Sequence, residues 1–309
     1  MARLVAAVAG VAAAALTLVG CGESAATTAA PRPATTPSSI PVVASTDVWG
    51  DIADQVGGRA VHVTSVITDP AADPHAYEAD ARTQLAVSRA RVVIENGGGY
   101  DDFMARLLRA AGSKATVIDA VDVSGKAAAA KAAGTDLNEH VWYDFPTVGK
   151  VADRIAAALS AADPTDAASF RANAAAFDAK LDALITDEQT DKLRTAGVGV
   201  AITEPVPLYL LQALGAVDKT PPAFSHAVED GDDVPPALLQ QTTALLSSGA
   251  VKALVYNAQT SDVQTAVVRK AAESANVAVV PVTETLPPGT SYLRWMSDNL
   301  TAVSKALAP

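Results

Sequence analysis

Cysteine is nearly absent from this chain, since Cys21 is the only one among 309 residues. A single cysteine excludes an intrachain disulfide. Lysine and arginine are also few, 23 against 34 aspartates and glutamates, which leaves a net charge of −11. Nucleic acid is therefore not expected as a partner, because phosphate backbones attract basic surfaces. Half of the residues are apolar, so the chain can bury a sizeable core, and its length suggests about two domains.

An apolar run lies at the N-terminus, where Arg3 precedes Leu4–Val19. The run is shorter than the roughly 20 residues that a transmembrane helix needs, so residues 1–20 are predicted to be a signal peptide. Residues 18–21, Leu-Val-Gly-Cys, resemble the bacterial lipobox, in which the cysteine becomes the lipidated first residue. The alternative is an ordinary secretory peptide with a stray cysteine. With Cys21 acylated, the protein is expected on the extracytoplasmic face of the cell membrane, held by its lipid.

Residues 21–40 are rich in Ala, Thr, Pro and Ser without periodicity, which is typical of a flexible tether. Beyond them, short apolar strands alternate with helical patterns, an order that indicates parallel sheets with βαβ crossovers. We therefore predict an α/β fold with two lobes, residues 41–162 and 196–309, each a mainly parallel sheet flanked by helices. The predicted strands are 42–45, 61–66, 92–95, 116–119, 198–202, 251–256 and 277–282.

Residues 163–195 are predicted to form one long helix between the lobes. Asp163 and Pro164 suit a cap and a first turn, and Thr147 is predicted to cap the helix before it. At 1.5 Å per residue the long helix would span roughly 45 Å, more than one lobe needs, so we interpret it as a rigid bridge with the ligand cleft between the lobes. Its apolar stripe is Phe170, Ala174, Phe177, Leu181 and Leu184.

Only four histidines are present, yet two of them stand in similar phrases. His75 lies in Asp-Pro-His-Ala-Tyr-Glu (73–78) and His140 in Asn-Glu-His-Val-Trp-Tyr-Asp (138–144). A neutral imidazole is the commonest transition-metal ligand, and a nearby carboxylate can fix its tautomer. The two phrases predict one metal ion that is held by two separate loops.

Two glutamates extend this candidate site. Ligands of open α/β sheets bind beyond the carboxyl ends of the strands. Glu204 and Glu284 each follow an apolar strand as the second residue of a Thr-Glu pair. With His75 and His140 they give two candidate ligands from each half of the chain. A metal bound by all four would lie between the lobes and join them.

The remaining histidines and a glycine run have other interpretations. His62 falls inside a strand pattern and is assigned to a sheet face, whereas His226, in an acidic loop with prolines, is the best further candidate for a ligand. Residues 97–99, Gly-Gly-Gly, lack the Gly-Lys-[Ser/Thr] of a P-loop and the spacing of a dinucleotide fingerprint. A tight turn beside the cleft is favoured over a phosphate cradle.

Five phrases carry a resemblance to a known family: 73–78, 96–101 (Asn-Gly-Gly-Gly-Tyr-Asp), 138–144, 256–260 (Tyr-Asn-Ala-Gln-Thr) and 283–287 (Thr-Glu-Thr-Leu-Pro). Over about residues 42–307 the chain resembles the zinc/manganese solute-binding lipoproteins of bacterial ABC transporters, the family 9 type of periplasmic solute-binding protein. The resemblance implies two α/β lobes joined by one long helix. It also implies metal ligands at His75, His140, Glu204 and Glu284.

The implied function is capture of Zn²⁺ or Mn²⁺, with Fe²⁺ less favoured, by a monomer that is not an enzyme and delivers the ion to an ABC permease. Zinc-dedicated members of the family often have a third His where Glu204 stands and a His/Asp-rich loop, which this chain lacks. Manganese and iron members typically have Asp where Glu284 stands. Carboxylate ligands suit Mn²⁺, but the same set also binds Zn²⁺.

Two other functions were weighed. A secreted metallohydrolase needs an open coordination position and a general base, but His-Glu-x-x-His is absent and all four candidates resemble ligands. A binder of a small organic ligand, such as a vitamin or a siderophore, would have a wider cleft lined by Trp, Arg and Tyr. The chain has only three Trp, and two of them, Trp49 and Trp295, fit helix-face patterns.

Overall fold

The computed structural model describes residues 39–70, 72, 74, 77–260 and 262–308. The predicted signal peptide, Cys21, almost all of the predicted tether and the candidate ligand His75 lie outside these residues. Ile40, the last residue of the predicted tether, is instead the first residue of a strand. Among the described helices we find none with both the length and the hydropathy needed to cross a bilayer.

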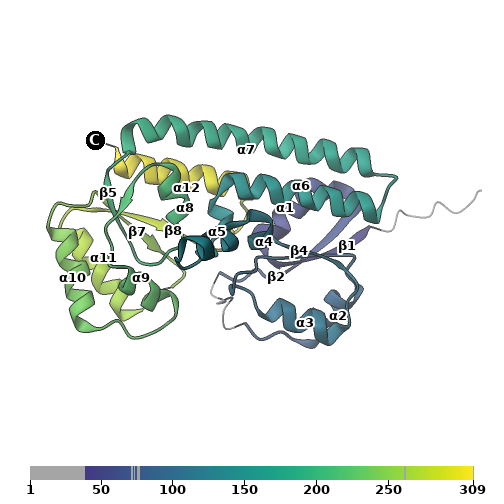
Figure 1. Ribbon diagram of the computed structural model, residues 1–309, viewed down its shortest axis with the longest axis horizontal. Helices are drawn as coiled ribbons and strands as arrows, with labels where there is room; N and C mark the ends of the chain where they lie inside the picture. The colour runs from purple at the N-terminus through teal and green to yellow at the C-terminus, as the bar shows by residue number, and fades with distance from the viewer. Residues whose placement is uncertain (1–38, 71, 73, 75–76, 261, 309) are drawn as a thin grey trace, which may run out of the picture. The chain divides into compact units, whose positions relative to one another are not determined.

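The first sheet contains four parallel strands in the order β2-β1-β3-β4 (Figure 1). All four correspond to predicted strands within a few residues. The strands are β1 (Ile40–Thr46), β2 (Val61–Ile67), β3 (Val92–Glu95) and β4 (Thr116–Asp119). The helices of this lobe are α1 (Asp47–Gly57), α2 (Ala81–Arg89), α3 (Phe103–Ala111), α4 (Ala120–Ser124) and α5 (Lys126–Ala133), with 3-10 turns at η1 (Gly58–Ala60) and η2 (Val141–Tyr143).

The second sheet repeats this layout with four parallel strands in the order β6-β5-β7-β8. The strands are β5 (Gly199–Ile202), β6 (Val217–Asp218), β7 (Ala253–Asn257) and β8 (Ala278–Val282). The helices are α8 (Leu208–Ala213), α9 (Pro222–Glu229), α10 (Pro236–Ser247), α11 (Val263–Ser274) and α12 (Tyr292–Leu307). The two-residue strand β6 was not predicted, because so short a segment carries no period.

Both faces of the first sheet are covered at its centre, which explains why the central strands β1 and β3 are mainly apolar. Val43 and Val93 pack with Phe103 of α3 in one buried cluster. Val42 and Ala44 point to the opposite face, into a larger cluster that includes side chains of α1 and α6 (Phe145–Ala162). That larger cluster continues through the long helix α7 and α12 to β5 and β7. The two lobes therefore share part of one core.

Helix α7 (Ala167–Thr195) has 29 residues and at 1.5 Å per residue spans about 44 Å. Its buried residues include the predicted apolar stripe, and it packs against α1 and α6 of the first lobe and α12 of the second. Figure 1 shows α7 running along both lobes. The helix begins at Ala167, four residues later than predicted, because Asp163 ends α6 and then accepts a hydrogen bond from the Thr165 amide at 2.9 Å.

Hydrogen bonds also connect the lobes without passing through α7. The Tyr143 hydroxyl donates to the Thr283 carbonyl at 2.7 Å, and the Tyr292 hydroxyl donates to the Trp142 carbonyl at 2.6 Å. Further links are Leu286 N to Asp47 Oδ1 (3.1 Å), Tyr292 N to Asp51 Oδ2 (2.9 Å), Tyr209 Oη to the Asn138 carbonyl (2.6 Å) and Asn138 Nδ2 to the Pro205 carbonyl (3.1 Å). The lobes are thus joined by contacts that involve no metal ion.

Two local predictions need correction. The N-cap of α6 is Asp144, whose side chain accepts hydrogen bonds from the amide and hydroxyl of Thr147, so Thr147 lies inside the helix. His226 lies in helix α9, not in a loop, because Pro221 and Pro222 begin a short helix there. Prolines are compatible with the first turn of a helix, and this explains why the segment was mistaken for a loop.

Candidate metal centre

His140 lies on the loop between α5 and α6, and only 1% of it is exposed. Its Nδ1 is 2.7 Å from Asn138 Oδ1, an oxygen that can only accept, so Nδ1 carries the proton and Nε2 has the lone pair. The Asn138 amide is oriented by its own hydrogen bond to the Pro205 carbonyl. We expected a carboxylate to fix this tautomer, and the partner is instead an amide, since the nearby Asp144 caps α6.

Glu204 lies just beyond the end of β5, and 3% of it is exposed. Its Oε2 accepts a hydrogen bond of 2.7 Å from Asn257 Nδ2 at the end of β7. Its Oε1 has no hydrogen-bond partner among the described residues. A buried carboxylate oxygen without a partner is costly unless a cation binds it.

Glu284 follows β8 and shares the same amide donor. Asn257 Nδ2 donates to Glu284 Oε1 at 2.7 Å, while the Tyr100 hydroxyl of the first lobe donates to Oε2 at 3.1 Å. Gln259 Oε1 accepts from the Glu284 amide at 2.6 Å and so holds the backbone. The strands β5, β7 and β8 are adjacent and parallel, which explains how Glu204, Asn257 and Glu284 meet at one edge of the sheet.

The glycine turn at residues 97–99 brings Tyr100 to this site. All three glycines have positive φ, and a Cβ on Gly97 would lie 2.2 Å from an Asp119 carboxylate oxygen, so larger residues do not fit. The Asp101 carboxylate accepts from the Gly97 amide at 2.8 Å and stabilises the turn. Tyr100 is fully buried, and its ring lies 5.9 Å from the His140 ring. A tight turn beside the site was predicted, but no role was predicted for Tyr100.

A carboxylate that was not among the predicted ligands lies close to the His140 imidazole. Glu229, the last residue of α9, has Oε1 at 3.4 Å from His140 Nε2. Ligand atoms of Glu139, His140 and Glu229 all lie within 4.8 Å of one another, a grouping that suits a metal ion. In the sequence, the only indication of Glu229 was its position three residues after His226, the further candidate ligand. His226 itself is exposed on α9.

Described residues that precede His75 in the sequence line a cavity together with Glu284. Pro70, Ala72 and Pro74 line a small cavity of about 60 Å³ together with Gln259 and Glu284. His75 itself is outside the described residues. His62 is exposed on β2, as its assignment to a sheet face predicted.

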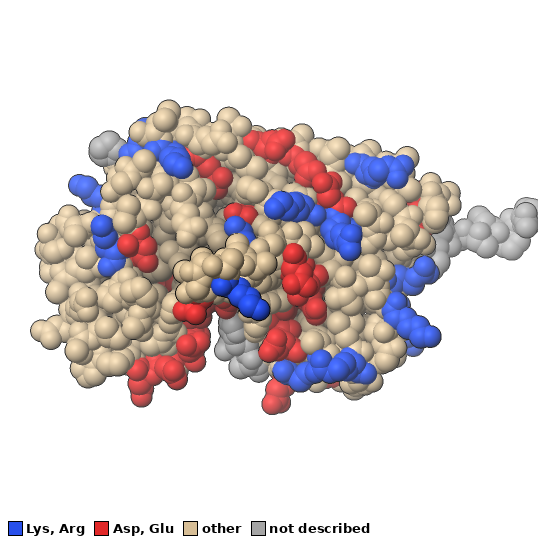
Figure 2. Space-filling view, viewed as in Figure 1, with Lys and Arg blue, Asp and Glu red and all other residues tan. Residues whose placement is uncertain are grey.

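The site gathers several carboxyl groups in a poorly solvated place, which favours their neutral, protonated form when no cation is bound. Burial raises the pKa of Glu204 to about 8, and the neighbouring Glu284 adds to the shift. Burial raises the pKa of Glu229 to about 9, with further contributions from Glu139, Glu204 and Glu284. Figure 2 shows Asp and Glu side chains on both sides of the indentation that opens below α5. A divalent cation bound here would compensate these charges.

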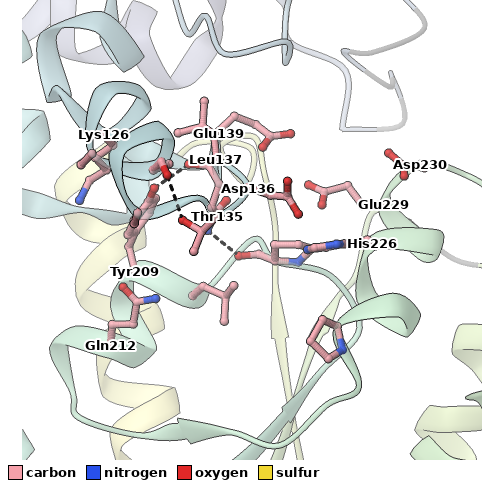
Figure 3. Close-up of a pocket in the computed structure, with 17 residues that line it drawn as sticks. Lys126, Thr135, Asp136, Leu137, Glu139, Tyr209, Gln212, His226, Glu229 and Asp230 are labelled. Carbon is pink, nitrogen blue, oxygen red and sulfur yellow. Dashed lines mark hydrogen bonds between the residues drawn. The ribbon is translucent and has the colours of Figure 1, made fainter.

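An open cavity of about 990 Å³ leads to this group from the side of α5, α8 and α9. Figure 3 shows Asp136, Glu139 and Glu229 around one end of it and Tyr209 and Gln212 at the other. The arrangement offers one imidazole nitrogen and several carboxylate oxygens to an ion. These are the donors that borderline divalent metals such as Zn²⁺ and Mn²⁺ accept.

Solved structures with the same fold support the two-lobe architecture. The periplasmic zinc binding protein TroA from Treponema pallidum has a TM-score of 0.72 at 17% identity, covering 88% of this chain and 100% of TroA. The protein FpvC from Pseudomonas aeruginosa, in complex with Ni²⁺, has a TM-score of 0.71 at 21% identity, covering 87% of this chain and 97% of FpvC. Identities this low show the fold alone, and they confirm the predicted arrangement of two α/β lobes and a long connecting helix.

Sequence comparison adds the family. The manganese-binding lipoprotein MntA of Bacillus subtilis (strain 168) is 31% identical over 160 residues, which are 51% of this chain and 49% of MntA. A putative metal-binding protein of Treponema pallidum (strain Nichols) is 27% identical over 158 residues, 47% of this chain and 50% of that protein. The chain spans about half the length of the curated relatives it matches. Residues 42–306 match the family described as ZnuA, zinc-uptake complex component A, periplasmic, and the chain therefore belongs to that family.

Proposed function

We propose that this protein captures a divalent transition metal ion, Zn²⁺ or Mn²⁺, outside the cytoplasm and delivers it to an ABC permease for import. The family description as a periplasmic component of zinc uptake supports import, and the manganese-binding relative supports Mn²⁺ as an alternative cargo. Attachment to the membrane through lipid on Cys21 belongs to the same proposal. It is supported by the lipobox-like residues 18–21 and by the description of MntA as a lipoprotein.

The proposed ligands are His75, His140, Glu204 and Glu284. The observation that carries the proposal is that Glu204 and Glu284 share one neutral amide donor although both are carboxylates at a largely buried site. Among the ion pairs of the described residues, Glu204 has no lysine or arginine partner. Pro74 beside Glu284 supports His75 as the fourth ligand.

The ligand set bears on which ion is bound. Imidazole nitrogens suit zinc, whereas carboxylate oxygens suit manganese, and the proposed set contains two of each. Raw affinity follows the general order in which Zn²⁺ exceeds Mn²⁺, so zinc binding alone would not identify the cargo. The two alternatives from the sequence, a metallohydrolase and an organic-ligand binder, are not favoured by a family that is described by metal uptake.

Calorimetric titration of the metal-free protein with Zn²⁺ and with Mn²⁺ tests the proposal. We expect one ion per chain, and we expect His140→Ala and His75→Ala each to weaken binding by about 100-fold or more, because each removes a direct ligand. His62→Ala is the matched control, since His62 is exposed on β2, and it should bind as the wild type does. Undiminished binding by His140→Ala would contradict the ligand assignment, and no binding by the wild type would contradict the function. Elemental analysis of protein purified without chelator then reports the ion acquired in the cell.

A further inference from the structure

Glu229 and His140 are placed as two ligands of one metal ion would be. Two donor atoms that each lie about 2.1 Å from a tetrahedral metal are about 3.4 Å apart. His140 Nε2 and Glu229 Oε1 are separated by 3.4 Å. Nε2 is the nitrogen with the lone pair, because Nδ1 donates to Asn138. The side chain from α9 thus reaches the same nitrogen that would bind the ion.

The surroundings of Glu229 are unfavourable for a carboxylate in the absence of a cation. Its Oε1 is buried and has no hydrogen-bond partner among the described residues, and 13% of the side chain is exposed. Glu229 is also the last residue of α9, where unpaired carbonyls give the helix end a partial negative charge that repels an anion. Glu139 is near enough to place a ligand atom within 4.8 Å. A bound divalent cation would offset all of these costs.

We propose that Glu229 is an additional ligand of the captured metal ion, contributed by α9 at the inner end of the cavity between α5 and α9. The inference rests on the proposed function and deepens it, since it adds a third carboxylate from the second lobe to Glu204 and Glu284. Carboxylate oxygen is a donor that Mn²⁺ prefers, so Glu229 shifts selectivity toward Mn²⁺ relative to Zn²⁺. The cavity that Glu139 and Glu229 line is then the route by which the ion reaches His140, since Glu229 Oε1 lies 3.4 Å from His140 Nε2.

A simple ion pair between a protonated His140 and Glu229 is the competing explanation of the same 3.4 Å distance. The two explanations differ in what they require of the metal-free protein. An ion pair stabilises the protein without metal and leaves the metal's coordination unchanged. A ligand changes the coordination and contributes little to the metal-free fold.

The experiment uses Glu229→Gln, which keeps the shape of the side chain, and Asp230→Asn as the matched control. Asp230 is the next residue, is exposed and lines the same cavity, so its substitution removes the same charge without touching His140. We expect Glu229→Gln to weaken Mn²⁺ binding about 10-fold or more and Asp230→Asn to change it less than about 2-fold. With Co²⁺ as a spectroscopic probe, the visible absorption bands should change in Glu229→Gln and not in Asp230→Asn.

A second variant keeps the test decisive if Glu229→Gln folds poorly. Glu229→His replaces an oxygen donor with nitrogen, and the ratio of Zn²⁺ to Mn²⁺ affinity should rise about 10-fold or more if residue 229 is a ligand. Wild-type-like Mn²⁺ affinity and Co²⁺ bands in Glu229→Gln would overturn the inference and leave the proposed function intact. Equal losses in Glu229→Gln and Asp230→Asn would also overturn it, by showing a general effect of charge. Failure of the wild type to bind any of these ions would overturn both proposals.

Discussion

The Tyr100 hydroxyl donates a hydrogen bond of 3.1 Å to Oε2 of Glu284, from one lobe to the other. This contact orients a carboxylate that is a proposed ligand by means of a residue on the opposite side of the cleft. It also explains why a run of three glycines precedes Tyr100, since the turn at residues 97–99 aims the tyrosine at the second lobe.

The first prediction follows from this contact. Tyr100→Phe should weaken Mn²⁺ and Zn²⁺ binding about 10-fold, because a hydrogen bond to a charged group contributes about 1.5–3 kcal/mol. Tyr256→Phe is the control and should leave the affinity unchanged. Tyr256 is buried, and Cζ of Arg269 in α11 lies 5.5 Å from the centre of its ring. Titration calorimetry of both variants checks the prediction, and equal affinities for Tyr100→Phe and the wild type would contradict it.

A second prediction concerns Asn257, whose single amide group donates to both Glu204 and Glu284. Asn257→Ala should lower the free energy of unfolding of the metal-free protein by about 1–3 kcal/mol, because the buried Glu204 and the half-buried Glu284 lose a donor. It should also weaken metal binding, since the carboxylates are no longer held in place. Asn173→Ala is the control, because it removes an amide that donates to the Val56 carbonyl, away from the two glutamates. If the two variants lose metal affinity equally, Asn257 has no special role at the site.

Exchange of a ligand type gives a third prediction. Glu204→His should raise the ratio of Zn²⁺ to Mn²⁺ affinity by about 10-fold or more, because imidazole is a better donor for zinc and carboxylate for manganese. Competition between the two ions for the metal-free variant measures this ratio directly. Glu273→His, at an exposed position on α11, controls for the added imidazole. An unchanged ratio in Glu204→His would argue that Glu204 is not a ligand.

The fourth prediction concerns pH and a residue outside the site. Glu188 is buried on α7, and burial raises its pKa from 4.5 to about 8, with a further contribution from Asp144. Between these pH values the folded protein holds this proton more tightly than the unfolded chain does, so stability falls as pH rises from about 4.5 to about 8 and is level above. Glu188→Gln should remove the part of this dependence that Glu188 contributes, while Glu204 and Glu229, whose pKa values are also raised, keep theirs.

Urea unfolding of the metal-free protein at pH 5 and pH 8.5 measures the effect. We expect Glu188→Gln to gain on the order of 4 kcal/mol relative to the wild type between the two pH values. Glu273→Gln, at an exposed position, should follow the wild type at both. A wild-type pH dependence that persists in Glu188→Gln would show that the proton on Glu188 is not its cause.

Some of the site was predictable because it lies at strand ends. Glu204 and Glu284 were predicted since each follows an apolar strand directly, and parallel strands bring such positions to one edge of the sheet. The helix α7 was predicted because its stripe of Phe and Leu repeats over many turns. Its first turn was predicted wrongly, since Asp163-Pro164 suits a helix start as well as the end of α6 and the turn that follows.

Other parts of the site depend on packing that the sequence does not display. Tyr100 and Glu284 are 184 positions apart, and their contact requires both lobes to be docked. Glu229 was overlooked for the same reason, because its distance to His140 is set by how α9 packs against the loop between α5 and α6. Asn138 stands two residues before His140 and accepts from its Nδ1. A carboxylate was expected as that acceptor because residues 138–144 contain Glu139 and Asp144.

The hydrogen bonds that join Tyr292 to Trp142 and Tyr143 to Thr283 bear on how long a captured ion stays bound. These bonds and the shared core around α7 include no proposed metal ligand, so ion loss by separation of the lobes must first break them. The dwell time of a captured ion would then depend on protein contacts that lie near the proposed ligands in sequence but are not themselves metal bonds. Substitutions such as Tyr292→Phe would shorten that dwell time without altering any metal bond, and the permease that we propose as the partner would trigger release if it competed for the same contacts on docking.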